Sequence, residues 1–433
     1  MISRIAGRSG SQHLFRTVLA GATLCLAAAM VQGPAAAQSP LEALRQFNQR
    51  AEWEDRFDAT MAGLEAIKSR SPTLSPETAT HLEQAIQQYS WLVSQGGWPV
   101  VTSGKQAMKI GMRDPNVVTL RRRLMASGDL EQTAGLSDTF DSYVDAAVRR
   151  FQVRHGLIPD GAVGRGTLIA LNVPAEVRLA QLETNLVRVK SMSGFLGDRY
   201  VMVNIPAAEI EAVEFGQVRS RHTAVVGKID RQTPILNSKI YELNFNPYWT
   251  VPVSIIRKDL IPKMLEDPQY LEKNRIRIFD WKNNELSWQQ IDWNTDEATQ
   301  YQFRQDPGEI NSLGSVRINF HNTHQVYLHD TPSKSLFGSD YRFHSSGCVR
   351  VQNVRELITW ILESTTPEWN RARVDETIRS GAREDVKLKS QMPLYLTYIT
   401  AWATPEGVVH FREDIYNRDG LAVADNATQA ALQ

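Results

Sequence analysis

The sequence of 433 residues lacks any excess of basic charge, because 48 lysine and arginine residues balance 48 aspartate and glutamate residues. This balance argues against a nucleic-acid-binding protein, and it fits an uncharged or zwitterionic substrate better than a polyanion. Long apolar segments are also missing after residue 37, so no membrane span is expected there. The hydrophobic content of 42% is ordinary for a globular protein, and the length suggests two or three domains.

The first 37 residues have the three-part layout of a secretory signal peptide. A basic start without acidic residues precedes an apolar run at 18–30 and an Ala-x-Ala cleavage site at 35–37. An uncleaved membrane anchor is the alternative, but the run is shorter than the roughly 20 apolar residues that a span needs. We therefore expect segment 1–37 to be removed from an exported protein.

Cysteine is nearly absent, with only Cys25 and Cys348 in the chain. Cys25 lies inside the apolar run and is expected to leave with the signal peptide. Cys348 then has no intramolecular partner. In an oxidising compartment, such a lone thiol is either linked to another chain or reactive.

Apolar residues at helical spacing dominate the chain before residue 200. An N-terminal region, 38–113, is predicted to be helical, and a second unit of three short helices is predicted at 114–173. A helical connector is expected at 174–199. The apolar positions that define the best-patterned helices are Leu82, Ile86, Tyr89 and Leu92 in the first region, and Val117, Leu120, Leu124, Val144, Ala147, Val148 and Phe151 in the second.

The unit at 114–173 resembles the peptidoglycan-binding type 1 domain. The matching motifs are Val117-x-x-Leu120-x-x-x-Leu124, Ala147-Val148-x-x-Phe151-Gln152, Gly156-Leu157 and Asp160-Gly161-x-Val163-Gly164-x-x-Thr167. The resemblance implies binding to the glycan strands and peptides of the cell wall. A generic three-helix packing module is the alternative that periodicity alone leaves open.

From about residue 200 the pattern changes to the period of two that is typical of strands. Strands are predicted at 200–205, 223–227, 240–245, 316–320, 325–329 and 394–402. They indicate a β-rich domain at 200–403, either a sandwich or a barrel-like sheet, followed by a loosely ordered C-terminal tail at 404–433. A polar insert with helical stretches, 253–307, is too long for a bare loop and suggests a lid, with surface decoration as the alternative. The predicted fold class is thus multidomain α+β, with a mainly-β domain, a helical lid insert, a small three-helix domain and an N-terminal helical region.

The chemistry concentrates in two short segments. Alternation in the strand at 325–329 places Tyr327 and His329 on the face opposite to the apolar residues. Cys348 follows in Ser345-Ser346-Gly347-Cys348-Val349-Arg350, a few residues before an amphipathic helix for which Asn353 is the predicted N-cap. The helix dipole and a nearby histidine would lower the pKa of the cysteine, and Gly347 allows a sharp bend with amide groups that point at an oxyanion.

These segments resemble the catalytic motif of the L,D-transpeptidase family of the YkuD type. The match comprises His329, a spacer of the family's length, Ser345, Gly347, Cys348, Val349 and Arg350. Ser346 stands where the family usually has histidine, a substitution similar to that of the large Gram-negative branch. The resemblance spans about 200–402 and includes Asn204-Ile205-Pro206, Val226-Gly227-Lys228, Thr233-Pro234, Asn246-Pro247-x-Trp249-x-Val251-Pro252 and His329-Asp330-Thr331-Pro332.

The resemblance implies a periplasmic, cell-wall-associated cysteine acyltransferase of a Gram-negative bacterium. Cys348 would attack the bond between a diamino acid and D-Ala of a tetrapeptide stem, and a second stem would resolve the thioester into a 3→3 cross-link. His329 would transfer the protons, oriented by Asp330 or a backbone carbonyl, while Tyr327 would line the pocket. No cofactor is required, and carbapenems should acylate Cys348, because a strained lactam mimics the donor amide.

Several alternatives stay open. Water as acceptor would make the enzyme an L,D-carboxypeptidase or endopeptidase. Alternatively, the enzyme could attach a protein to the stem peptide or detach one from it. Two further interpretations are that the protein is a non-enzymatic scaffold that binds the cell wall, or that Cys348 forms a disulfide with another chain. Arg350 either binds a substrate carboxylate or anchors the loop, and His344 either touches substrate or is structural. His321 and His324 could supply metal ligands, but the cysteine explains the cluster and no metal is expected.

Overall fold

A computed structural model describes residues 69–104 and 106–420. The predicted signal peptide, Cys25 and the last part of the predicted tail, 421–433, lie outside the described residues. Within the described ranges, no helix combines the length and the apolar character that crossing a membrane requires.

The described chain before the large sheet is helical, as its apolar spacing predicts. The helices are α2 (Pro76–Ser94), α3 (Asn116–Ala126), η3 (Gln132–Ala134), α4 (Ser142–Arg154), α5 (Arg165–Asn172) and α6 (Ala175–Met192). Side chains cap two of them: the Ser75 hydroxyl accepts from the Thr78 amide, and Asp141 accepts from the first amides of α4. α3, α4 and α5 share one core, in which Leu120, Val148 and Phe151 are fully buried.

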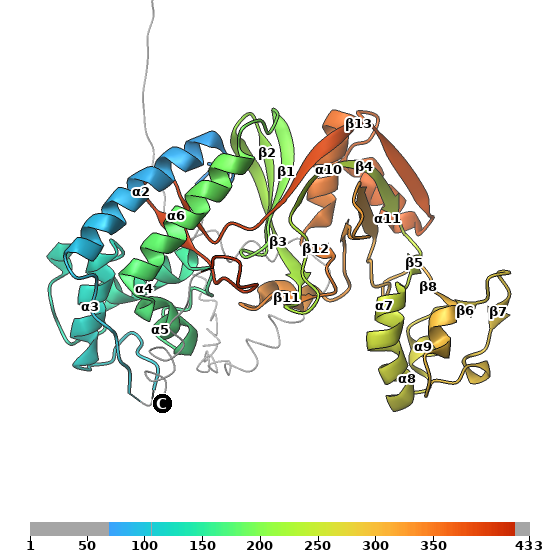
Figure 1. Cartoon of the computed structure of the whole chain (residues 1–433), viewed down its shortest axis with the longest axis horizontal. Helices are drawn as coiled ribbons and strands as arrows, with labels where there is room; N and C mark the ends of the chain where they lie inside the picture. The colour runs from blue at the N-terminus through green and yellow to red at the C-terminus, as the bar shows by residue number, and fades with distance from the viewer. Residues whose placement is uncertain (1–68, 105, 421–433) are drawn as a thin grey trace, which may run out of the picture. The chain divides into compact units, whose positions relative to one another are not determined.

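A nine-stranded mixed sheet follows (Figure 1). Its strands are β1 (Arg199–Asn204), β2 (Glu209–Glu214), β3 (Gln217–Gly227), β4 (Leu236–Phe245), β9 (Val316–Phe320), β10 (Leu328–His329), β11 (Phe343–Ser345), β12 (Val349–Val351) and β13 (Glu384–Thr397). They run in the order β11-β3-β12-β10-β9-β4-β13-β1-β2, and β2 pairs with β3 as well. The long strand β3 thus changes partners along its length and brings the ladder back on itself, in agreement with the predicted barrel-like sheet.

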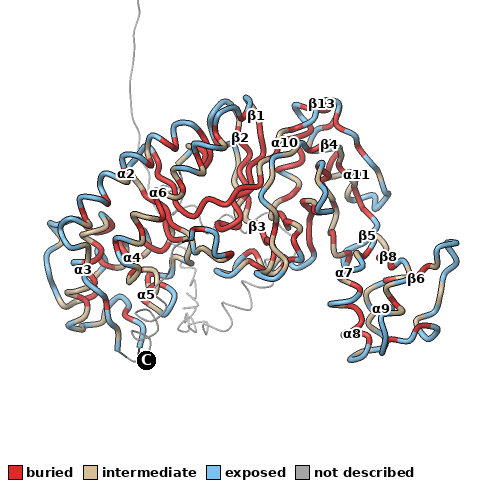
Figure 2. The backbone as a smooth tube through the Cα atoms, in the orientation of Figure 1, coloured by how far each residue is buried: buried red, intermediate tan, exposed pale blue. Residues whose placement is uncertain are grey.

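The interior of this sheet holds the main core. Figure 2 shows buried positions along β1, β3 and β4. The short helix η7 (Lys334–Gly338) and the helices α10 (Val354–Thr365) and α11 (Arg371–Ser380) belong to this part of the chain. α10 contributes Leu357, Ile358 and Ile361 to the core, at the spacing that the sequence predicts. Asn353 occupies the N-cap position with φ +49°, and its side chain makes no capping hydrogen bond, contrary to the prediction.

The insert is a small folded unit rather than a purely helical lid. Its elements are β5 (Trp249–Thr250), α7 (Val253–Ile255), the π-helical turn η4 (Ile256–Leu260), α8 (Ile261–Glu266), α9 (Tyr270–Lys273), β6 (Ile276–Phe279), β7 (Glu285–Leu286), η5 (Trp288–Gln290), η6 (Glu297–Gln300) and β8 (Gln302–Gln305). The strands form a separate sheet in the order β5-β8-β6-β7, over a core that includes Ile261, Ile278 and Phe303. This strand content corrects the prediction of a helical insert at 253–307.

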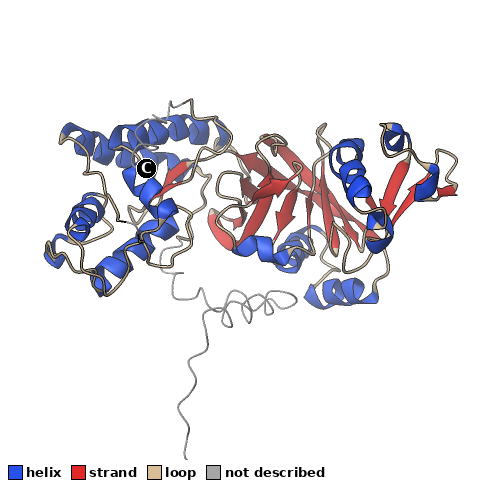
Figure 3. Ribbon diagram, turned by 90° about the horizontal axis from the view of Figure 1, so that it is seen from below, coloured by secondary structure: helices blue, strands red, loops and turns tan. Residues whose placement is uncertain are grey.

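The predicted loose tail is also corrected, because residues 404–420 are part of the fold. β15 (Val409–Phe411) pairs with β14 (Ala401–Ala403). This hairpin lies among the helices rather than in the large sheet (Figure 3). Phe411 is buried against α2 and α6, and Arg154 of α4 donates to the Val409 carbonyl at 3.1 Å. Long-range packing of this kind leaves no local pattern.

The predicted boundary between the first two helical regions, at 113/114, is not a structural break. Met108 forms a β-bridge with Val163, and Arg113 forms one with Thr139. Met108 is also buried in the core that α3, α4 and α5 share. The segment that leads into α3 therefore belongs to the three-helix unit.

Candidate active site

His329 ends strand β10 (Leu328–His329), and Cys348 immediately precedes the neighbouring strand β12 (Val349–Val351). β10 and β12 are parallel, with Leu328 opposite Val349 and His329 opposite Arg350, and the Val349 amide donates to the Tyr327 carbonyl at 3.0 Å. Leu328 and Val349 point into the core, so the residues on either side of them in sequence share the opposite face. His329 and Cys348 are diagonal neighbours on that face, with Cα atoms about 8 Å apart by strand geometry, a gap that an imidazole and a thiol can bridge.

His329 is buried and oriented through one ring nitrogen. Its side chain is 6% exposed, and Nδ1 lies 2.5 Å from the carbonyl oxygen of Asp330. Because a carbonyl only accepts, Nδ1 carries the proton of the neutral ring, which leaves Nε2 as the basic nitrogen. Burial, reinforced by the charge of Arg350, lowers the pKa of His329 to about 3. The resting imidazole is therefore neutral at ordinary pH.

Asp330 orients His329 through its backbone, while its carboxylate is committed elsewhere. The carboxylate accepts from the Ser315 amide at 2.9 Å and the Ser315 hydroxyl at 2.7 Å, and it forms an ion pair with Lys334. The backbone of Gly314 packs so closely that an added Cβ would lie 2.5 Å from this carboxylate. The carboxylate of Asp330 is therefore already engaged within the protein, and its role as a substrate-binding residue stays a prediction.

The Cys348 thiol differs from the prediction in its electrostatics. Burial raises the pKa of the thiol, and hydrogen bonds from the amide and hydroxyl of Tyr327 oppose this effect only in part. The expected lowering by the following helix is not observed, because β12 separates Cys348 from the first residue of α10. The site at rest thus holds a neutral thiol beside a neutral imidazole. The two Tyr327 donors are placed to stabilise a thiolate once the proton leaves.

A network of local bonds fixes the turn before the cysteine. Gly347 has φ +111°, a conformation that side chains disfavour, and its carbonyl accepts from Thr233 at 2.9 Å. The Ser345 hydroxyl accepts from the Gly347 amide at 3.1 Å and donates to the Cys348 carbonyl. The bend predicted at Gly347 is confirmed. Its amide is already bonded within the turn, so it does not point at an oxyanion as expected.

Ser346 connects the turn to the insert rather than to the chemistry. Its hydroxyl accepts from Arg231 at 2.8 Å, and the same guanidinium pairs with Asp259 at 2.5 Å. Asp259 belongs to the π-helical turn η4 at the beginning of the insert. Arg231 therefore links the segment beside Cys348 to the insert, and no sequence pattern predicts this link.

The remaining predicted residues separate into two groups. Arg350 lies opposite His329 on β12, and its charge acts on both His329 and Cys348. His344 lies on β11, where Nε2 bonds to the Tyr341 carbonyl at 3.1 Å and the ring packs edge-on against Tyr341. Arg350 thus faces the site, whereas the contacts of His344 are structural.

Two residues that the sequence reasoning missed also face the site. Arg317 on β9 lies directly opposite His329, and its guanidinium is 4.4 Å from the centre of the Tyr327 ring. Trp249 on β5 lies beside the Tyr327 hydroxyl and lowers the pKa of that group. Alternation along 316–320 could have placed Arg317 on the polar face, but only the pairing of β9 with β10 brings it beside His329.

Comparisons with known proteins match two parts of the chain to known families. Residues 198–374 match the family model described as "L,D-transpeptidase catalytic domain", and residues 113–171 match the one described as "Putative peptidoglycan binding domain". Both resemblances seen in the sequence are confirmed. A "Putative L,D-transpeptidase" of Haemophilus influenzae is 33% identical over 220 residues, which cover 51% of this chain and 44% of the relative. The chain thus spans less than half the length of the curated relative that it matches.

Solved structures give distant matches of the same kind. An L,D-transpeptidase from Mycobacterium smegmatis is 12% identical with a TM-score of 0.23, over 46% of this chain and 58% of its own. One from Xylanimonas cellulosilytica is 16% identical with a TM-score of 0.22, over 68% of this chain and 99% of its own. Neither likeness is close enough to transfer detail to this protein.

Proposed function

We propose that the protein is a cysteine acyltransferase that forms 3→3 cross-links between peptidoglycan stem peptides, because residues 198–374 match the model of the L,D-transpeptidase catalytic domain. The observation that supports the proposal most directly is that Cys348 immediately precedes β12, the strand that pairs in parallel with β10, where His329 lies. A free thiol and a basic nitrogen there would suffice for acyl transfer without any other nucleophile.

In the first half of the reaction, Nε2 of His329 takes the thiol proton as the Cys348 sulfur attacks the carbonyl of the diamino acid. The C–S bond forms, and the imidazolium returns the proton to the departing amine as the C–N bond to D-Ala breaks. The product is an acyl-thioester and free D-Ala. The Nδ1 bond to the Asp330 carbonyl keeps the ring in the tautomer that this transfer needs.

In the second half, the side-chain amine of a second stem attacks the thioester carbonyl. His329 accepts a proton from this amine, the C–N bond of the cross-link forms, and the C–S bond breaks to release Cys348. The energy of the original amide bond is conserved in the thioester, so no cofactor is needed. With the Gly347 amide engaged in the turn, the Cys348 amide is the remaining candidate to hold the oxyanion.

Neutral partners at rest suit this mechanism. Burial keeps the pKa of His329 at about 3 and raises that of the thiol, so proton transfer is unfavourable before the substrate binds. Tyr327 then compensates part of the cost, because its polar groups lower the pKa of the thiol. The thiol is thereby protected from general reactivity until a carbonyl is in place.

The rest of the chain extends this proposal. We propose that the three-helix unit holds the enzyme on cell-wall peptidoglycan, and that the protein acts in the periplasm of a Gram-negative bacterium after export. The two matched domains support an exported, wall-associated protein. We also propose that carbapenems acylate Cys348, which would appear as the mass of the intact drug added to the protein.

Intact-mass spectrometry with a defined tetrapeptide stem tests the proposal. The wild-type protein should gain the tripeptide as a thioester and release D-Ala, and addition of a second stem should yield a cross-linked dimer. Cys348→Ala should form neither product, His329→Gln should form both far more slowly, and the control His344→Gln should behave as wild type. Cross-linking by Cys348→Ala would refute the mechanism. Free tripeptide as the only product would instead identify a carboxypeptidase.

A further inference from the structure

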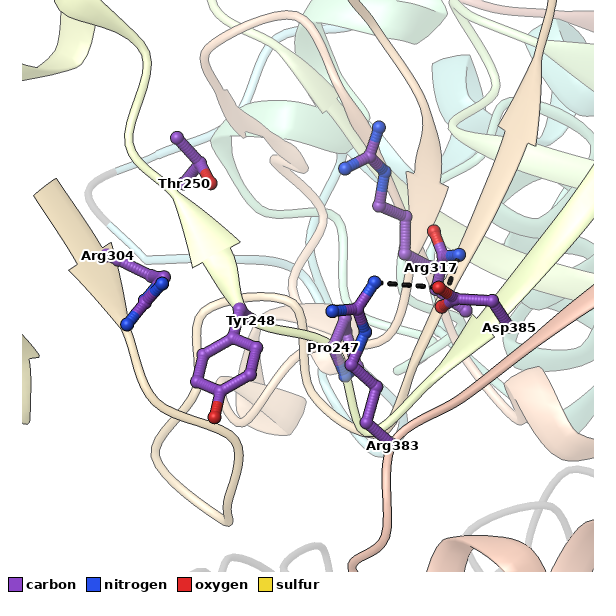
Figure 4. Close-up of a pocket in the computed structure, with 8 residues that line it drawn as sticks. Pro247, Tyr248, Thr250, Arg304, Arg317, Arg383 and Asp385 are labelled. Atoms are coloured by element: carbon purple, nitrogen blue, oxygen red, sulfur yellow. Dashed lines mark hydrogen bonds and ion pairs between the residues drawn. The ribbon is translucent and has the colours of Figure 1, made fainter. Parts of the chain in front are cut away.

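A pocket with an excess of arginine lies beside the catalytic face. It has a volume of about 320 Å³ and forms where the base of the insert meets the large sheet (Figure 4). Its lining residues come from β4, β8, β9, β13 and the segment around β5. They are Asn244, Pro247, Tyr248, Thr250, Arg304, Arg317, Arg383 and Asp385.

The charges that line the pocket are not balanced within the protein. Asp385 is its single acidic residue, and it already accepts from Arg383 at 2.7 Å and from Asn244 at 2.8 Å. Neither Arg304 nor Arg317 forms an ion pair with any residue in the described ranges. The pocket therefore retains two positive charges.

Aromatic rings hold these two arginines in place. The guanidinium of Arg304 lies 4.9 Å from the Tyr248 ring centre and 4.3 Å from that of Phe279, and that of Arg317 stacks over Tyr327. Their Nε atoms are buried without a hydrogen-bond partner. Stacking orders a guanidinium while leaving its planar edge available, and that edge matches a carboxylate in a bidentate fashion.

The side chain of Tyr327 lies between the pocket and the sulfur of Cys348. Arg317 lines the pocket, stacks on Tyr327 and lies opposite His329. Tyr327 in turn hydrogen-bonds to the Cys348 sulfur. A ligand group held by Arg317 would therefore belong to the part of a substrate that lies within a few bonds of the reacting carbonyl.

We propose that Arg304 and Arg317 form a subsite for a carboxylate of a peptidoglycan stem peptide, next to the amide that is cleaved or the amine that attacks. The inference rests on the proposed function. The carboxylate belongs either to the donor stem, on its terminal D-Ala or its diamino acid, or to the diamino acid of the acceptor stem. Both sources present the same group to the same pair of guanidinium ions.

Arg304→Gln is the sharpest variant, because Arg304 lies in the insert and is not in contact with Cys348 or His329. A matched control exists in Arg277→Gln. Arg277 pairs with Arg304 across β6 and β8, but its guanidinium is bound to Asp306 at 2.8 Å, and it does not line the pocket. Arg304→Lys, which keeps the charge but loses the planar fork, should recover part of the activity.

The experiment measures thioester formation and its resolution separately by intact mass. Donors and acceptors are used either with free carboxylates or with one carboxylate converted to the amide. Arg304→Gln should slow one of the two steps by about 10- to 100-fold with the free carboxylate, and by less than about threefold with the matching amide. Loss in the first step assigns the site to the donor, and loss in the second assigns it to the acceptor.

Equal losses with acid and amide, or no loss in either step, would overturn the subsite. Thermal unfolding and alkylation of Cys348 by iodoacetamide should match wild type in Arg304→Gln, which separates a binding defect from misfolding. Should folding suffer, Arg317→Gln provides the second test of the same acid-to-amide difference. If the wild-type protein forms no thioester at all, the proposed function has failed rather than the subsite.

Discussion

Replacing Tyr327 by phenylalanine should slow acylation of Cys348 by about 10- to 100-fold. The change removes the hydroxyl donor to the sulfur but keeps the amide donor and the ring on which Arg317 stacks. A hydrogen bond to a charged group contributes about 1.5–3 kcal/mol, and each 1.4 kcal/mol is a factor of ten in rate or equilibrium. Burial raises the pKa of Tyr327, so its hydroxyl remains protonated and able to donate throughout the useful pH range.

The variant should also lose some stability. Trp249, which is half-buried, lies beside the Tyr327 hydroxyl, and phenylalanine removes this polar contact. The loss of one such interaction costs about 0.5–1.5 kcal/mol in the free energy of unfolding. Chemical denaturation measures this loss separately from the kinetic effect.

Two assays isolate the kinetic effect. Alkylation of Cys348 by iodoacetamide, followed between about pH 6 and 10, should show the thiol ionising at higher pH in the variant. Acylation by a carbapenem, followed by intact mass, should show the loss in rate. Tyr143→Phe is the control, because Tyr143 is 67% exposed on α4 and outside the catalytic domain. An unchanged alkylation profile together with an unchanged acylation rate would refute the role of the hydroxyl.

Three further predictions concern the surroundings of the site. Burial lowers the pKa of His329 from its ordinary value of 6.5 to about 3, so the folded state loses stability as the pH falls from about 6.5 toward 3. His329→Gln should therefore lose less stability than wild type between about pH 6.5 and 4, and equal losses would contradict the burial of the neutral ring. Gly227→Ala should lower the free energy of unfolding by about 1–3 kcal/mol, because its Cβ would lie 2.2 Å from the Arg231 carbonyl oxygen; an unchanged denaturation midpoint would speak against this close packing. Asp259→Asn should lower the free energy of unfolding by no more than about 1 kcal/mol. It should raise KM for the donor stem, because it removes the ion pair that links the insert to Arg231 and, through it, to Ser346. A KM equal to that of wild type would show that this link does not affect substrate binding.

Helices were predictable because their signals are local. α4 buries Val144, Val148 and Phe151 at helical spacing, and its cap lies at the adjacent Asp141. All of this information falls within fourteen neighbouring residues, 141–154. No partner from elsewhere in the chain is needed to interpret it.

The strands and the segment 404–420 were harder to predict, because their structure depends on partners that are distant in the sequence. β2 has Glu209, Glu211 and Glu214 in a six-residue strand, a composition that disfavours strands. Glu211 is nevertheless buried, where it accepts hydrogen bonds from Thr73 and Arg221. These partners come from segments that sequence patterns do not place together.

The candidate site shows the same division. Alternation predicts that Tyr327 and His329 share a face, and the motif identifies Cys348 as their partner. The strand itself is shorter than predicted, because Gln325 has φ +57° and cannot extend it. Which arginines surround the pair follows from the order β9-β10-β12, and that order is a property of the whole sheet.

The parallel pairing of β10 with β12 has a consequence for how this protein can vary. Backbone bonds between the two strands hold the imidazole and the thiol in register, whatever lies in the connection that joins them. Insertions or deletions in this connection should thus be tolerated as long as the flanking strands persist and Lys334 and the buried Phe337 keep their contacts. The number of residues between His329 and Cys348 can therefore change during evolution, whereas the distance between the two side chains cannot.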